Sequence, residues 1–211
     1  MFVGDYDRIL DLLKNCYFPT REGVANFHDI YMDALILAGQ DKVKKGDVEG
    51  ALALYNQAFE YPENHQVFLL DGRSPHDAQV YCAIAEAYEV LGDDAKAKEN
   101  WEKAAQVNVK KTNYRYWKGI ALKKLGKKAE AKQLFKDLVA AGKAGIVTDY
   151  VNFYGAEGTT GSTVESINTK AYYTMGLGYK GLGRNFKAKR CFRESVELKR
   201  DNLWPNVMLR K

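Results

Sequence analysis

The 211-residue sequence has only three cysteines, three histidines and four prolines, and it contains no apolar run of about 18 residues. Cys16, Cys82 and Cys191 are odd in number and far apart, which excludes a disulfide framework and favours small buried residues in a reducing compartment. The missing apolar run excludes a membrane span, and the early acidic residues after Met1 exclude a signal peptide. We therefore expect a soluble, cytoplasmic protein that does not bind membranes.

Basic side chains are scarce in the first half of the chain, and acidic side chains are scarce in the second half. Residues 1–102 hold 9 basic and 19 acidic side chains, whereas residues 103–211 hold 23 basic and 8 acidic ones. A basic half could meet nucleic acid, anionic lipid or an acidic protein. Lysines also cluster on ordinary solvated helix faces, and this interpretation is favoured. Polyanion binding through the basic half is the lowest-ranked alternative, and nucleic acid is not the expected partner.

Motifs for catalysis or for a cofactor are also missing. The three histidines have no partner at a metal-ligand spacing, and there is no Gly-rich Lys-Ser/Thr loop for phosphate. Gly176-x-Gly178-x2-Gly181 matches a dinucleotide-binding string, but it lies inside a helical pattern where glycines allow close packing. Cys82 reads as a buried thiol rather than a nucleophile. We expect no enzyme activity, no metal and no cofactor.

A pattern of Gly, a polar step and then Ala-x3-aromatic occurs four times. The four copies run from Gly46 to Ala58, from Gly92 to Ala104, from Gly126 to Leu138 and from Gly183 to Ser195. A second helical pattern precedes each glycine, so each unit reads as helix, tight turn, helix. The turn glycines suit a helix C-terminus with positive φ. Ser74-Pro75-His76-Asp77 predicts the start of another helix, with Ser74 as its cap.

These residues resemble the tetratricopeptide repeat, most closely in the second and fourth units. The resemblance implies an all-α, right-handed α-solenoid of four helical hairpins in a single domain, with an N-terminal capping helix and two loop insertions. We expect a mobile loop at Gly155–Ser162 and an extended connection from Tyr61 to Gly72. The expected segments are a capping segment at 1–26, repeats at 27–62, 74–109, 112–142 and 168–200, an insertion at 143–167 and a tail at 201–211.

A narrower resemblance covers nearly the whole chain. Asp11-Leu12-Leu13, Tyr17-Phe18-Pro19, Tyr61-Pro62-Glu63-Asn64 and the end at Leu203-Trp204 resemble the C-terminal repeat region of large bacterial proteins with an N-terminal, mutarotase-like domain associated with carbohydrate. The resemblance implies that the chain is part of, or related to, such a larger protein.

In tetratricopeptide repeats, the helix face next to the packed stripe lines a concave ligand groove. Carried over to this sequence, that face holds aromatic, aliphatic and charged side chains, and it implies a protein or peptide partner. The alternatives are that its rings pack against the 141–168 insertion or a terminal helix, and that the chain is a structural module that docks on its own parent domain or on a second copy. The candidate groove residues are Glu86, Glu89, Tyr116, Trp117, Ile120, Lys123, Lys124, Tyr173, Leu177 and Lys180.

Overall fold

The computed structural model describes residues 6–17, 27–60, 62–65, 74–110, 113–149 and 163–210. Every regular element in these ranges is helical, which confirms the predicted all-α fold of helical hairpins. None of the helices in these ranges is long and apolar enough to cross a membrane. The chain divides into two compact units, Met1–Gly126 and Lys127–Lys211, and each unit is described by itself. The boundary falls inside the predicted third repeat, and a single-domain organisation stays a prediction.

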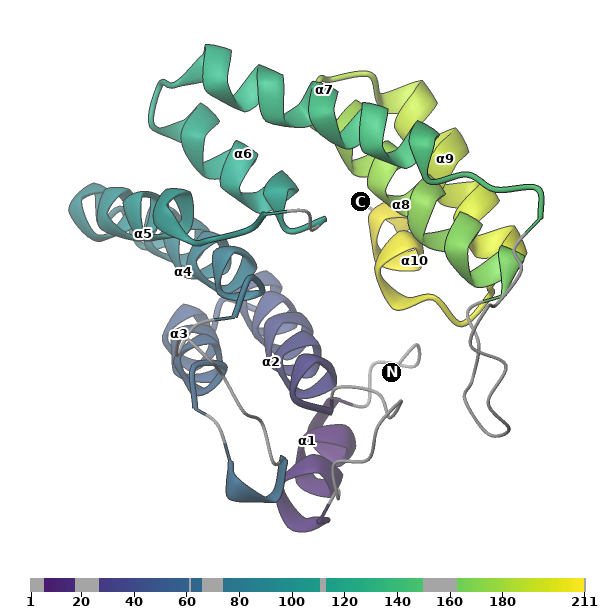
Figure 1. The fold of residues 1–211 in the computed structure, drawn as a ribbon. Helices are drawn as coiled ribbons and strands as arrows, with labels where there is room; N and C mark the ends of the chain where they lie inside the picture. Colours follow the sequence, from purple (N-terminus) through teal and green to yellow (C-terminus); the bar gives the residue numbers. More distant parts are fainter. Residues whose placement is uncertain are drawn as a thin grey trace. The chain divides into compact units, whose positions relative to one another are not determined.

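The first unit contains two complete hairpins, α2 with α3 and α4 with α5, and then the single helix α6 (Figure 1). Helix α4 contacts both α2 and α6, so these three helices form one layer, while α3 and α5 pack behind it. Helix α1 packs on α2 and confirms the predicted capping helix. The helices are α1 (Tyr6–Asn15), α2 (Phe27–Lys44), α3 (Val48–Gln57), the 3-10 turn η1 (Glu63–His65), α4 (Asp77–Leu91), α5 (Asp94–Gln106) and α6 (Arg115–Lys124).

The second unit is built around α8, which packs against α7 on one side and α9 on the other. Helix α10 packs on α9. The sequence predicts a plain tail after residue 200, but Pro205 sits in the first turn of α10, where proline is tolerated, and Met208 is buried. The helices are α7 (Lys128–Ala144), α8 (Val164–Gly181), α9 (Asn185–Leu198) and α10 (Leu203–Arg210).

The four turn glycines adopt the conformation that the sequence predicts. Gly46, Gly92, Gly126 and Gly183 have φ angles between 74° and 85°, a region that glycine enters without steric cost. After two of them an aspartate caps the next helix: Asp47 accepts a hydrogen bond from the amide of Gly50, and Asp93 accepts one from the amide of Lys96. Within the two units, the turns at Gly46, Gly92 and Gly183 reverse the chain, so that the helices joined by each turn pack as a hairpin.

Small residues allow the helices to approach closely, as predicted. A Cβ atom on Gly176 would lie 2.4 Å from a ring carbon of Phe192, and one on Gly178 would lie 2.7 Å from the backbone oxygen of Phe135. The dinucleotide-like string therefore serves packing of α8 against α9 and α7. The alanines of the repeat and the aromatic rings that follow them are all buried: Ala51, Ala97, Ala131, Ala188, Tyr55, Trp101, Phe135 and Phe192.

Two predicted boundaries differ from the structure. Helix α4 begins at Asp77 rather than at Pro75, because Ser74 accepts a hydrogen bond from the amide of His76 and so shapes a turn before the helix. Helix α8 begins at Val164, within the predicted insertion, because the Thr163 hydroxyl caps it by accepting from the amide of Ser166. The mobile loop predicted at 155–162 lies outside the described residues, as does most of the predicted connection from 61 to 72.

Candidate functional site

The layer of α2, α4 and α6 in the first unit carries seven of the predicted groove residues. Glu86 and Glu89 are exposed on α4, and Lys123 and Lys124 are exposed on α6. Ile120, also on α6, is half-buried. Since α4 and α6 are in contact, this face of the first unit combines carboxylates, ammonium groups and an aliphatic side chain.

Glu89 and Lys124 join the three helices α4, α5 and α6. The ammonium nitrogen of Lys124 lies 2.8 Å and 2.9 Å from the two carboxylate oxygens of Glu89. The indole nitrogen of Trp101 donates a second hydrogen bond to Glu89 over 3.0 Å, and Lys124 lies 5.3 Å from the centroid of the same ring. These two predicted groove residues are therefore engaged with each other and with the α5 core.

Glu86 remains on the exposed side of this layer, close to two buried phenols. Burial raises the pKa values of Tyr55 and Tyr116, and the negative charge of Glu86 raises both further. Burial also raises the pKa of Cys82, whose thiol donates to the backbone oxygen of Trp117 over 3.4 Å. A thiol kept protonated in this way is a poor nucleophile, in agreement with the sequence-based interpretation.

The aromatic residues that were predicted to form ligand platforms are largely enclosed. Tyr116 and Trp117 are buried in the first unit, and their rings meet edge to face at 5.0 Å. In the second unit Tyr173 is buried, with its ring 6.1 Å from that of Phe192, and Leu177 is fully buried. Only Lys180 of the second-unit set retains partial exposure. Burial leaves little of these rings accessible to a ligand. The groove lined by all ten residues and its alternative, packing of the rings against the 141–168 insertion or a terminal helix, both stay predictions.

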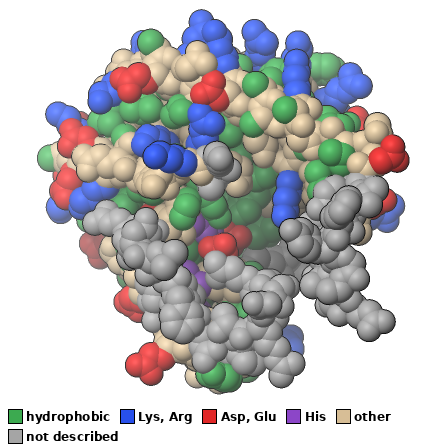
Figure 2. Space-filling model, viewed as in Figure 1, with side chains coloured by type: hydrophobic (Ala, Val, Ile, Leu, Met, Phe, Trp, Pro, Cys, Tyr) green, Lys and Arg blue, Asp and Glu red, His purple; other side chains and the backbone are tan. Residues whose placement is uncertain are grey.

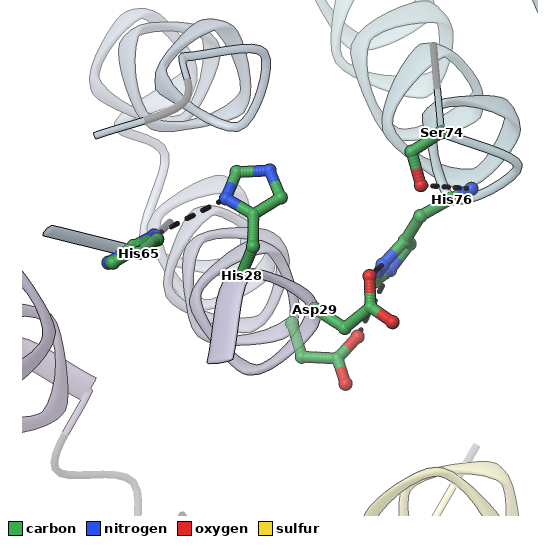
Figure 3. Close-up of polar contacts among 6 residues, drawn as sticks. His28, Asp29, His65, Ser74 and His76 are labelled. Carbon is green, nitrogen blue, oxygen red and sulfur yellow. Dashed lines mark hydrogen bonds and ion pairs between the residues drawn. The ribbon is translucent and has the colours of Figure 1, made fainter. Parts of the chain in front are cut away.

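The structure brings the chain's three histidines, which the sequence had given no role, into one region of the first unit (Figure 3). His76 is fully buried, with Nε2 3.1 Å from Oδ1 of Asp33 and Nδ1 3.7 Å from Oδ1 of Asp29. Burial lowers the pKa of His76, but the two carboxylates outweigh it and raise the pKa to about 9. A pKa raised in this way favours the charged imidazole at neutral pH, and the contacts with Asp29 and Asp33 tie the start of α4 to α2. The ring of Tyr114 covers it at 4.7 Å.

His28 and His65 form the second part of this region. Their Nδ1 atoms are 3.4 Å apart, and Nε2 of His65 lies 2.9 Å from the backbone oxygen of Leu13 in α1. The Leu13 contact requires the proton of His65 on Nε2, which leaves its Nδ1 to accept from His28. Burial, together with His65 and His76, lowers the pKa of His28 to about 4, although Asp29 opposes this.

Two side chains of η1, those of Asn64 and His65, attach the capping helix to the first unit. Asn64 donates hydrogen bonds to the backbone oxygens of Leu13 and Cys16, beside the bond of His65 to Leu13. The turn η1 therefore closes the C-terminal end of α1. Over the described ranges of the chain, no group of three or more His, Cys, Asp or Glu side chains is placed to hold a metal ion.

A cavity of about 360 Å³ lies in the second unit between α8 and α9. Tyr172, Met175 and Tyr179 of α8 line one wall. The ammonium group of Lys187 lies 5.8 Å from the ring centroid of Tyr179, so the cavity has an aromatic and cationic edge. The remaining lining residues come from α9: Phe186, Lys187, Arg190, Cys191 and Glu194.

Basic side chains gather along the upper edge of the view in Figure 2, over α7. Lys128, Lys132 and Lys136 are exposed on this helix. Such a row is what a solvated helix face presents, and it is also the feature on which the polyanion alternative depends.

Comparison with known proteins identifies the repeat. The tetratricopeptide repeat model matches residues 78–108, 112–141 and 169–202. These segments correspond to the second, third and fourth predicted repeats, and the chain therefore carries tetratricopeptide repeats there. Among curated proteins, none matches the chain.

Several solved structures are similar to the chain at low identity. MamA residues 41 to the end, from Desulfovibrio magneticus RS-1, is 19% identical, with 88% of this chain and 82% of that chain covered and a TM-score of 0.30. YrrB, described as a TPR protein with an unusual peptide-binding site, is 14% identical, with 100% and 86% covered and a TM-score of 0.31. With TM-scores this low, neither likeness bears on function.

Proposed function

We propose that this chain is a non-catalytic protein-interaction scaffold that binds an extended peptide segment along the α2–α4–α6 layer of its first unit. Tetratricopeptide repeats support this function, because stacked helical hairpins create an extended surface without needing a catalytic centre. The single observation that carries the proposal is the contact of α4 with both α2 and α6, which makes one continuous face from residues of three repeats.

The chemistry of this face indicates the kind of peptide. Helix α4 offers the carboxylate of Glu86, and α6 offers the ammonium group of Lys123 and the aliphatic side chain of Ile120. A segment with an apolar residue flanked by charges of both signs would satisfy all three. Glu89 and Lys124 pair with each other and with Trp101, so little of either charge is left for a ligand. Tyr116 and Trp117 support the face from below.

Selection from a displayed random-peptide library against the full chain, followed by calorimetric titration of the selected peptide, tests the proposal. We expect Glu86→Lys and Lys123→Glu each to weaken binding about tenfold or more, with melting temperatures unchanged. Lys98→Glu, on the exposed side of α5, is the matched control and leaves the affinity unchanged. Equal affinity of all three variants and the wild type would exclude this face as the site.

The relation to a larger bacterial, carbohydrate-associated protein rests on the sequence resemblance alone and stays a prediction, as do the cytoplasmic location and docking on a parent domain. The polyanion alternative also stays a prediction. Retention on a heparin column at low salt, lost on Lys128→Glu with Lys132→Glu, would favour it.

A further inference from the structure

The α8–α9 cavity of the second unit has the composition of a docking site. Its wall is aromatic and apolar, and the 83% exposed ring of Phe186 on its rim extends this apolar surface outward, as contiguous apolar patches at interaction sites do. The charges on its rim are mainly basic: Lys187 and Arg190 stand against Glu194, whose carboxylate lies 3.9 Å from Nε of Arg190 in an exposed ion pair. A complementary surface would therefore present exposed aliphatic side chains beside carboxylates.

The chain itself carries such a surface in its first unit. At the end of α4, Val90 is 62% exposed and Leu91 is 49% exposed. Past the turn at Gly92, the exposed Asp94 begins α5. Two adjacent exposed aliphatic residues followed closely by a carboxylate match the apolar wall and the basic rim of the cavity.

The charges of the two units favour the same pairing over longer distances. The first unit, residues 1–126, holds 16 basic and 19 acidic side chains, and the second unit, residues 127–211, holds 16 basic and 8 acidic ones. The first unit of one copy is therefore attracted to the second unit of another, with a range of about one Debye length.

We propose that the α8–α9 cavity of one copy takes up the α4–α5 turn of a second copy, so that the chain self-associates head to tail. Val90 and Leu91 enter the cavity beside Phe186, and Asp94 pairs with Arg190 on the rim. An apolar cavity of about 150 Å³ holds a benzene molecule, so the present volume has room for both aliphatic side chains.

This contact joins two different surfaces, so each bound pair keeps one unused cavity and one unused turn. A heterologous contact of this kind produces rings when the rotation closes and open chains when it does not. Self-association would thus display several copies of the α2–α4–α6 layer, although the proposal does not depend on what that layer binds.

Light scattering of the full chain over a wide range of concentration, at low and high salt, tests the proposal. The average mass should rise with concentration, and less so at high salt. Phe186→Ala and the charge reversals Arg190→Glu and Asp94→Arg should each weaken association about tenfold or more. The combined variant Arg190→Glu with Asp94→Arg should regain association, because the ion pair is restored with its signs exchanged.

Lys189→Glu is the matched control, since Lys189 is exposed on α9 but does not line the cavity, and it should leave association unchanged. All variants are first compared with the wild type by thermal melting. A wild-type chain that remains monomeric at every concentration overturns the proposal, whether or not a foreign acidic peptide binds the cavity. Association that is insensitive to the single reversals, or that the combined variant does not regain, also overturns it.

Discussion

The imidazole Nε2 of His76 lies 3.1 Å from Oδ1 of Asp33, and this contact joins the second hairpin of the first unit to the first. His76 stands just before α4, whereas Asp33 lies on α2, beside Asp29 one turn earlier. A charged histidine next to a helix N-terminus is disfavoured by the helix dipole. The carboxylates of Asp29 and Asp33 offset this cost, and they stabilise a positive charge on a fully buried side chain.

We expect the stability of the protein to fall as the pH rises through about 9. The folded-state pKa of His76 is about 9, above its unfolded value of about 6.5, so its contribution is complete below pH 6.5 and is lost as the pH rises through 9. The difference corresponds to about 3 kcal/mol of unfolding free energy. Urea denaturation at pH 6.5, 8 and 10 gives the unfolding free energy of the wild type and of His76→Gln. The contribution of His76 is the extra loss of unfolding free energy in the wild type between pH 6.5 and 10. Equal declines in both proteins would show that His76 is not charged in the folded state.

His28 should give the opposite dependence on the acid side. Its folded-state pKa of about 4 lies below the unfolded value, so its contribution is present above pH 6.5 and is lost as the pH falls toward 4. Protonation of His28 would add a positive charge beside His65 and near the charged His76. We expect NMR titration of the imidazole carbons to show that His28 stays neutral at pH 5, with its resonances assigned by comparison with the His28→Gln variant. A midpoint near 6.5 for His28 would contradict its position in the core.

The helical hairpins were predictable because their signals are local. The turn glycine, the polar residue directly after it and the small residues of each repeat act within one or two helices. Gly92, with Asp93 as the cap of α5, is an example. The division of the chain at Gly126 had no such signal. Gly126 has the same positive φ as the other three turn glycines, so nothing in the pattern distinguishes it.

The histidine region was not predictable, because it depends on the packing of segments far apart in the sequence. His28 and His65 are 37 positions apart and come from α2 and η1, while His76 precedes α4. None of these intervals resembles a metal or catalytic motif. The one usable signal was a weak one, a histidine in the turn that follows Ser74 and Pro75, where a carboxylate on a neighbouring helix could reach it.

Gly176→Ala should destabilise the second unit. The new Cβ would lie 2.4 Å from the Phe192 ring, which is itself fully buried and has no room to withdraw. Overpacking of this kind costs about 1–3 kcal/mol, and we expect the melting temperature to fall accordingly. Thr174→Ala, at a half-buried position of the same helix where the hydroxyl donates to the backbone oxygen of Lys170, is the control and should change the melting temperature less. A Gly176→Ala variant as stable as the control would contradict the close contact of α8 with α9.

Tyr116→Ala should act on stability first and on peptide binding only through it. The sequence places Tyr116 in the ligand groove, yet the structure buries it beneath the α4–α6 face, next to Cys82 and Glu86. Loss of a buried aromatic ring costs about 3–5 kcal/mol, so this variant should unfold at much lower urea concentration than the wild type. Ile120→Ala, which removes a half-buried side chain from the same helix, should lower the unfolding free energy less than Tyr116→Ala does. It should weaken binding of the selected peptide directly. Comparing unfolding midpoints with calorimetric affinities separates the two roles. If Tyr116→Ala kept the stability of the wild type and lost only peptide binding, the Tyr116 ring would belong to the ligand surface. The packing of α4 against α6 would then leave this ring more accessible than its burial indicates.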